Sequence, residues 1–437
     1  MSKIKTNKND KIASPLGGLR AWFMVSMGAL FYCYQFILRV LPNVLNDEIM
    51  TTFAIDAGAF GMIVGFYYWA YSGLQIPLGI TMDKFGPRLL LSLAGFTCGA
   101  ACFIFSLTTN IYVAGFSRFM MGMGAACGFL GTIKLGTLWF PPHKIGKVIA
   151  LTMIFGTSGA ALGGPPLSYL TDFLGWQSSL QTLGLVGIII GVIVFLFVRN
   201  TPSGEMPVTQ KNQNEKIFSG LAIVLLSPQA WLISIFSMLM YAPLIIMGDA
   251  WCVPFIESIY TIDEKYAATI HTSLFIGAAL GSPFFTFLSD RVSSRRIPMT
   301  LGALACLCVY MLIIFGNNIP LFFMYALFFL AGFCYTAKCL CFASMTEIIP
   351  PSSSGVSVGF SNMIVMAFGA VFHPLVGSML DFSWNGLVID GRNIYSELDY
   401  RFAMSVIPIC LALSLFVVGF IRETHPASSQ ARGRKNR

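Results

Sequence analysis

The stretch that decides the fold is Gly-Ile-Thr-Met-Asp-Lys-Phe-Gly-Pro-Arg at residues 79–88, a short charged turn between two long apolar segments. A related charged stretch, Leu-Ser-Asp-Arg-Val-Ser-Ser-Arg-Arg, stands at residues 288–296 and again separates two apolar segments. A second motif, Gly-Phe-x-x-Thr-x-Lys, begins at Gly128 and recurs at Gly332. The repeated order of these motifs indicates that the chain consists of two corresponding halves.

The composition around these motifs excludes a water-soluble protein. Of the 437 residues, 56% are hydrophobic and only 11% are charged, and the mean hydropathy is +0.74. Soluble globular chains carry roughly 25% charged residues. Less than half that proportion of charged residues is too small to cover a surface exposed to water, so we expect most of the surface to face lipid.

The apolar segments predict an all-α polytopic membrane protein with twelve spans in two pseudo-symmetric six-helix bundles. A helix of about 20 apolar residues crosses the hydrocarbon layer. The twelve expected spans centre near Leu30, Trp69, Gly99, Met123, Thr157, Ile188, Phe236, Phe275, Leu307, Leu330, Val365 and Ala412. The expected domains are a basic tail (1–20), an N-terminal bundle (21–199), a cytoplasmic linker (200–227), a C-terminal bundle (228–422) and a second basic tail (423–437).

The basic residues predict the orientation in the membrane. An even number of spans puts both ends of the chain on the same side of the membrane. The tails and loops of that side then contain twenty of the 27 Lys and Arg residues, and the loops of the opposite side contain three. Basic loops stay in the cytoplasm. We therefore expect both termini in the cytoplasm. The net charge of +8 sits beside the spans, which argues against nucleic acid as a partner.

Two motifs resemble the signatures of the major facilitator superfamily, over about residues 22–422. The first is the charged turn, whose matching residues are Gly79, Asp83, Lys84, Gly86 and Arg88. The second lies in the fourth span and comprises Arg118, Gly122 and Gly124. The resemblance implies a secondary carrier that works by alternating access, with its site at mid-membrane between the two repeats.

Shorter runs resemble one bacterial branch of that family. These are the stretches around residues 34–42, 66–71 and 139–142, which are similar to those of lysosomal dipeptide carriers and of phagosomal amino-acid carriers of intracellular bacteria. This resemblance implies import or facilitated movement of amino acids, small peptides or similar nutrients. The glycine run at residues 156–166 matches the antiporter signature only in part, which argues against an exporter.

A candidate substrate anchor lies in the first span. Tyr32, Gln35 and Arg39 share one helix face, and a guanidinium can bind a carboxylate through two parallel hydrogen bonds. Asp249 lies at nearly the same depth in the seventh span, the repeat partner of the first. Two interpretations stay open: Arg39 anchors a substrate carboxylate while Asp249 receives an ammonium group or a proton, or the two residues form a gate pair.

Further polar residues fall inside spans. Lys134 and Lys338 occupy matched places in spans four and ten, where they close the inner mouth, meet an anionic group or snorkel to the headgroups. Tyr67, Tyr71 and Gln75 form a helical stripe that either packs or lines a cavity.

Arg118 lies at mid-depth. The resemblance implies a part in proton coupling for it, and a buried arginine held by carbonyls is the alternative. His271 and His373 can each relay protons or simply hydrogen-bond.

The charged turns are expected to latch one global state rather than to touch the substrate. The residues concerned are Asp83, Lys84, Gly86 and Arg88 in the first half and Asp290, Arg291 and Arg295 in the second.

The sequence offers little support for other function classes. It contains no G-x-x-x-x-G-K-[ST] and no H-E-x-x-H, and its single G-x-S-x-G, at residues 355–359, stands at the start of an apolar span, so we expect neither an ATPase nor a hydrolase. The cysteines lie mostly in apolar runs and the four histidines are scattered, so we expect no metal site and no cofactor.

The leading hypothesis is a carrier of a small carboxylate-bearing nutrient, an amino acid, dipeptide or organic anion, that works as a monomer with the bilayer, the solute and protons as partners. The alternatives are a proton-driven exporter of amphipathic compounds and a transporter-like receptor without flux.

The topology generates the first test. Single cysteines introduced at Asn212 and Asn393 are expected to react from the cytoplasmic and the external side, respectively, because these residues lie in loops on opposite faces. Labelling with a membrane-impermeant maleimide measures this. The reverse pattern, or both residues on one face, contradicts the twelve-span arrangement.

Overall fold

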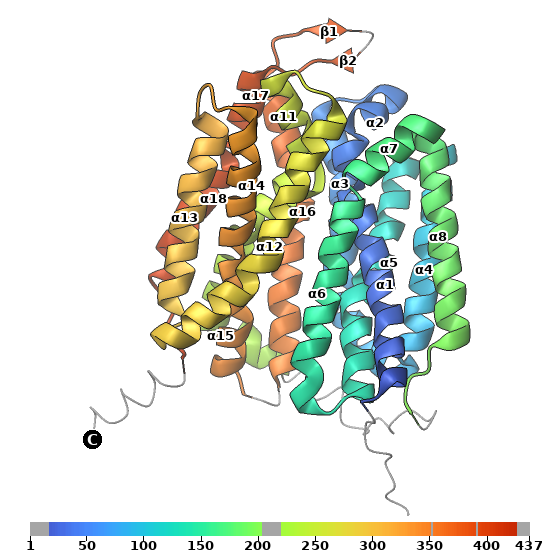
Figure 1. The fold of residues 1–437 in the computed structure, drawn as a ribbon, viewed down its shortest axis with the longest axis vertical. Coiled ribbons are helices and arrows are strands. Elements are labelled where there is room, and N and C mark those ends of the chain that lie inside the picture. Colours follow the sequence, from blue (N-terminus) through green and yellow to red (C-terminus); the bar gives the residue numbers. More distant parts are fainter. Residues whose placement is uncertain (1–16, 203–219, 351–352, 390–391, 426–437) are drawn as a thin grey trace, which may run out of the picture.

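The computed structural model describes residues 17–202, 220–350, 353–389 and 392–425 of the chain. Its long helices run side by side in two groups, which Figure 1 shows as a blue-to-green half and a yellow-to-red half. The first bundle consists of α1 (Leu19–Val44), α3 (Ala57–Phe85), α4 (Pro87–Leu107), α5 (Ile111–Trp139), α6 (Ile145–Leu162) with α7 (Pro165–Leu174), and α8 (Trp176–Phe197). Short α2 (Asn46–Phe53) and the 3-10 turn η1 (Pro142–Lys144) connect these helices.

The second bundle contains several broken spans. Its first span is α10 (Pro228–Pro243), which continues into the π-helix η2 (Leu244–Trp251) and α11 (Cys252–Tyr260). Its fourth span is α14 (Leu321–Tyr335), which continues into the 3-10 helix η3 (Thr336–Cys339) and α15 (Leu340–Ile348), and its last span is α17 (Glu397–Met404) with α18 (Val406–Val418). The unbroken spans are α12 (Glu264–Val292), α13 (Arg296–Phe315) and α16 (Ser354–Ser383). Strands β1 (Val388–Ile389) and β2 (Arg392–Asn393) form a small antiparallel hairpin in which Val388 faces Asn393.

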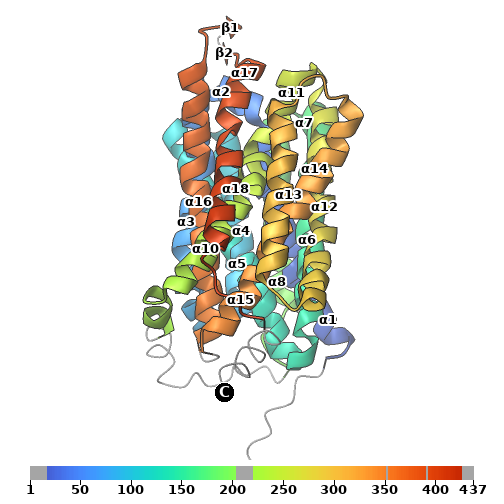
Figure 2. The ribbon, with the colours of Figure 1, turned by 90° about the vertical axis from the view of Figure 1, so that its left-hand side faces the viewer.

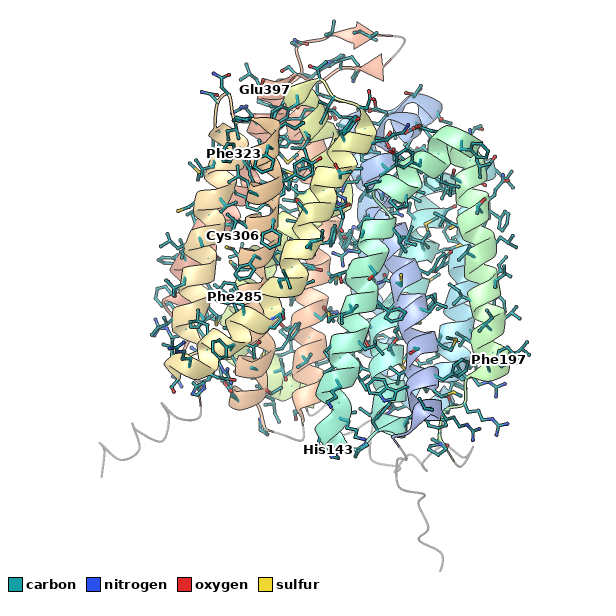
Figure 3. The ribbon with its side chains drawn as sticks, in the orientation of Figure 1. His143, Phe197, Phe285, Cys306, Phe323 and Glu397 are labelled. Atoms are coloured by element: carbon teal, nitrogen blue, oxygen red, sulfur yellow. The ribbon has the colours of Figure 1, made fainter. Side chains whose placement is uncertain are left out.

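The helices confirm the expected fold class. In the described ranges, eleven helices are long and apolar enough to cross a membrane, and the bent pair α2 and α3 makes a twelfth. Large apolar side chains point outward from the bundles, among them Phe197 and Phe323, which are 56% and 55% exposed, and Figure 3 shows both on the flanks of the molecule. Cys306 and Phe285, labelled in the same view, are buried.

The two ends of the molecule differ in structure. We call the end with α2, α17 and the β-hairpin the outer end, and the opposite end, with α15 and the start of α1, the inner end (Figures 1 and 2). Glu397 lies at the outer end and His143 at the inner end (Figure 3). Asn393 is part of the hairpin at the outer end, and Asn212 lies outside the described residues.

Glycines allow the helices of each bundle to approach closely. A Cβ atom on Gly122 of α5 would overlap the backbone carbonyl of Tyr67 on α3, so only glycine fits at this crossing. Gly86 has a φ of +80° and lies directly against the side chain of Asn200, whose Oδ1 accepts a hydrogen bond from the Arg88 amide at 2.9 Å. Both glycines of the sequence motifs are therefore required by the local geometry.

Between the bundles, α3 packs against α16. A Cβ atom on Gly61 would meet the carbonyl of His373, and one on Gly377 would meet that of Ala57. This interface positions the side chains of α3 beside those of the second bundle.

Gly122→Ala should lower the free energy of unfolding by about 1–3 kcal/mol, because an added methyl group in a tight helix crossing forces the backbones apart. Thermal unfolding of the purified protein measures the effect. Gly73→Ala in α3 is the matched control, since a Cβ there meets nothing within 4 Å; it should leave the melting temperature unchanged or raise it. Equal melting temperatures for Gly122→Ala and wild type would contradict the packing argument.

Candidate functional site

A buried ion pair joins the two bundles. Nη2 of Arg39 on α1 lies 2.9 Å from Oδ2 of Asp249 on η2, and the side chains are 4% and 0% exposed. Nε of Arg39 lies 3.1 Å from the same carboxylate, and the hydroxyl of Tyr68 on α3 also donates to Asp249. The structure thus brings together the two residues that sequence analysis placed at the same depth, in the arrangement of a gate pair.

Asp249 belongs to a π-helix whose backbone groups bind side chains of other helices. The side-chain amide nitrogen of Asn43 on α1 donates to the Met247 carbonyl of the π-helix at 2.9 Å, and the Asn43 oxygen accepts from the amide of Val253 in the following helix, α11, at 3.1 Å. Nε2 of His271 on α12 lies 2.6 Å from the Gly248 carbonyl. π-Helical turns occur frequently at functional sites, and here the turn is hydrogen-bonded to α1 and α12 near the ion pair.

Further polar contacts hold the bundles together toward the outer end. The amide of Gly58 at the start of α3 donates to Asp381 of α16 at 2.7 Å, and the neighbouring Ala57 amide donates to the Tyr395 hydroxyl at 3.0 Å. Lys265 of α12 forms an ion pair with Asp172 of α7. These contacts therefore link the two bundles at the outer end.

One aromatic ring contacts two buried cations from different bundles. The Tyr241 ring on α10 lies 5.5 Å from Cζ of Arg39 and 3.2 Å from Nζ of Lys338. Lys338 belongs to η3 and is 8% exposed. Within the described ranges this ring is the partner found for its ammonium group, and no carboxylate pairs with it. A cation over an aromatic face is stabilised, but its charge is not neutralised.

The second matched lysine has a different environment. Nζ of Lys134 on α5 lies 2.5 Å from Oδ1 of Asp83 at the end of α3, and the two side chains are 31% and 27% exposed. This pair lies within the first bundle. Sequence symmetry alone predicted a shared role for Lys134 and Lys338, whereas the structure gives a paired lysine in one half and a lysine on an aromatic ring in the other.

The charged turns also make contacts inside their own bundles. Arg88 donates to the Phe195 carbonyl at 2.6 Å. Arg295 lies 3.2 Å from Asp290 and 2.9 Å from Glu347 on α15. Lys84 and Arg291 are exposed, and Gly79 has open space around it. The inner-end ion pairs named here therefore stabilise each bundle separately.

Glu423, which sequence analysis did not single out, completes this inner-end network. Its carboxylate accepts hydrogen bonds from the Arg295 amide at 2.8 Å and the Ser294 hydroxyl at 2.5 Å. Partial burial raises the pKa of Glu423, but these hydrogen bonds outweigh it and lower the pKa to about 2. The side chain thus stays charged and caps the start of α13.

The tyrosine stripe of α3 faces buried partners. Tyr67 donates to Oε1 of Gln35 at 2.8 Å and stacks on Tyr71 at a centroid distance of 6.1 Å. Gln75 and Tyr32 are buried as well, 3% and 7% exposed.

Arg118 on α5 is buried above the Tyr67 ring. It donates to the Leu38 carbonyl at 2.9 Å, and its Cζ lies 5.1 Å from the ring centroid.

Sequence analysis missed or undervalued three residues of the site. Tyr241 contacts both cations, Tyr68 holds Asp249, and Asn43 binds the π-helix. A signal for Tyr241 was present: it precedes Asp249 by about two helical turns, as Tyr32 precedes Arg39.

His373 packs its ring against Tyr68 at 5.3 Å, and its ring nitrogens have no hydrogen-bond partner in the part of the chain that the structure describes.

The comparisons with known proteins match both halves of the chain to one family. The family model of the Major Facilitator Superfamily matches residues 24–251 and 250–436. Two solved structures share the fold. One is a bacterial homologue of the human lysosomal transporter Spinster in an inward-facing, unoccupied conformation, with a TM-score of 0.75 and 17% identity over 92% of this chain and 96% of that chain. The other is a variant of the nucleoside transporter NupG, with a TM-score of 0.74 and 14% identity over 92% of this chain and 99% of that chain.

Curated relatives carry the names of organic-anion transporters. The probable galactarate/D-glucarate transporter GudP of Escherichia coli is 23% identical over 416 residues, which cover 85% of this chain and 89% of that protein. The protein of the same name from Bacillus subtilis is 27% identical over 178 residues, 39% of each chain. The probable sulfoacetate transporter SauU of Cupriavidus necator is 24% identical over 186 residues, 43% of each chain. The partial matches thus span about two fifths of those relatives.

Removing one member of the buried ion pair should be much more harmful than removing both charges. Arg39→Gln leaves Asp249 charged and unpaired in a low-dielectric interior, which should cost about 3–5 kcal/mol of stability. The double variant Arg39→Gln with Asp249→Asn should recover most of this loss, because amides of similar shape can still hydrogen-bond. Thermal unfolding of the single and double variants measures the coupling, and additive losses would show that the two residues do not interact.

Proposed function

The chain belongs to the major facilitator superfamily, and within this family we propose that it carries small carboxylate-bearing solutes across a bacterial inner membrane by alternating access. It is an integral multi-pass membrane protein and a transporter rather than an enzyme. The contacts that link the bundles at the outer end and the inner-end ion pairs within each bundle agree with a carrier that opens toward the cytoplasm.

The observation that carries the proposal is the buried ammonium group of Lys338. A charge inside the membrane costs several kcal/mol unless it is paired or hydrated. Lys338 is 8% exposed and rests on the Tyr241 ring, with no carboxylate beside it among the described residues. A solute carboxylate supplies the missing counter-charge, and Lys338 is therefore our first choice for its anchor.

Arg39 and Asp249 complete the site from the first bundle and the π-helix. Tyr32, Gln35, Tyr67, Tyr71 and Gln75 supply buried polar or aromatic groups on α1 and α3. Asp249 is the candidate proton acceptor if transport is proton-coupled, because protonation of its carboxylate releases Arg39. The names of the relatives support organic anions as the solute class.

A zwitterionic amino acid or dipeptide is the second candidate solute, and one observation favours it. Arg39 and Asp249 present one charge of each sign at a distance of 2.9 Å, so a carboxylate and an ammonium group of a solute can replace the ion pair. This candidate agrees with the motifs that resemble dipeptide carriers.

Uptake into proteoliposomes tests the proposal. Solutes with a carboxylate, such as D-glucarate, D-gluconate or alanyl-alanine, should compete for transport, and neutral D-glucitol should not. Lys338→Met should reduce uptake at low solute concentration at least about tenfold, because a charge-assisted contact is lost. Lys147→Met, an exposed lysine at the inner end of α6, is the matched control and should transport like wild type.

Other outcomes separate the remaining hypotheses. Efflux of amphipathic compounds driven by a pH gradient, without carboxylate transport, would support an exporter. Ligand binding without any flux would support a receptor.

A further inference from the structure

We propose that the solute is a small dianion, with one acidic group on Lys338 and the other on Arg39. This inference rests on the proposed function and specifies its substrate class. It follows from the number of buried charges between the bundles and from the way that Tyr241 connects two of them.

The buried charges of the described spans do not balance. Three cations, Arg39, Arg118 and Lys338, are 4%, 1% and 8% exposed. One carboxylate, Asp249, is buried with them at 0% exposure. The other buried acid of the described ranges, Asp399, caps the start of α17 at the outer end and is not part of this group. With all four of these groups in their charged forms, the interior carries an excess of two positive charges.

Hydrogen bonds within the protein do not fully satisfy the two cations that lack a counter-charge, Arg118 and Lys338. Arg118 binds one carbonyl, but its Nε and Nη2 atoms have no partner among the described residues. Lys338 contacts the Tyr241 ring. Because a low-dielectric interior strengthens electrostatic interactions, a ligand that brings two negative charges neutralises the site, whereas a monoanion leaves one positive charge and a zwitterion leaves two.

The geometry brings two of the cations within reach of one small molecule. Arg39 and Lys338 both contact the Tyr241 ring, at 5.5 Å and 3.2 Å from its centroid. They come from different bundles, α1 and η3. A dianion that lies along the edge of this ring therefore connects the bundles through the solute, and its second acidic group competes with Asp249 for the Arg39 guanidinium.

Matched pairs of acids test the inference on the purified protein. D-glucarate and D-gluconate share a six-carbon polyol chain and differ in one carboxylate, and succinate and butyrate make the same comparison at four carbons. Binding constants from titration calorimetry should favour the dianion of at least one pair at least about tenfold. We expect a ratio of affinities of this size because the contact that the second carboxylate makes with Arg39 replaces the contact between Arg39 and Asp249, so only part of its free energy is gained.

Variants assign the two acidic groups. The double variant Arg39→Gln with Asp249→Asn should bind both members of the favoured pair with similar affinity, because the cation that binds the second acidic group is removed together with its own counter-charge, Asp249. Lys338→Met should weaken both members, and the control Lys147→Met should match wild type. Thermal unfolding without ligand verifies that each variant is folded.

The two proposals fail in different ways. Equal affinities within both pairs, or binding of alanyl-alanine in preference to every dianion, would overturn the dianion inference and leave carboxylate transport standing. Absence of binding and uptake for all the carboxylates would overturn both. A dianion preference that survives in the double variant would remove Arg39 from the site.

Discussion

The absence of water in the membrane interior is the constraint on which this structure depends. Every buried charge there needs a counter-charge, a ring face or a hydrogen-bond acceptor. Arg39 and Asp249 satisfy each other and in doing so connect the bundles. Lys338 and Arg118 rest on the rings of Tyr241 and Tyr67 instead. Only the first of these two solutions supplies a counter-charge, so Lys338 and Arg118 keep a positive charge that no carboxylate of the described residues offsets.

The polar contacts of the two ends have different functions. Toward the outer end, Gly58 binds Asp381 and Lys265 binds Asp172, and both contacts cross between the bundles. At the inner end, the pairs of Asp83 with Lys134 and of Arg295 with Glu347 stay within one bundle. These inner-end pairs thus stabilise each bundle by itself, whereas the two outer-end contacts link one bundle to the other. This arrangement suits two bodies that rock about the solute site.

The fold could be predicted from the sequence because its causes are local. Apolar length determines the spans, and the repeated motifs indicate the two halves. The depth of Arg39 and Asp249 followed from counting residues along a helix, and their contact required only that the repeats face each other. The environments of Lys134 and Lys338 could not be predicted in this way, since identical motifs acquire different partners when Asp83 reaches one lysine and Tyr241 the other. The π-helix was not predictable either, because its hydrogen bonds with Asn43 and His271 come from other helices.

The π-helix η2 has a mechanical consequence. A π-helix pairs each amide with the carbonyl five residues back instead of four, so the stretch from Leu244 to Trp251 contains more residues per turn than the α-helices on either side. Restoring α geometry there rotates α11 about the helix axis and turns Asp249 away from the face that it presents to Arg39. The position of Asp249 opposite Arg39 therefore depends on the winding of η2 as well as on the packing of the two bundles.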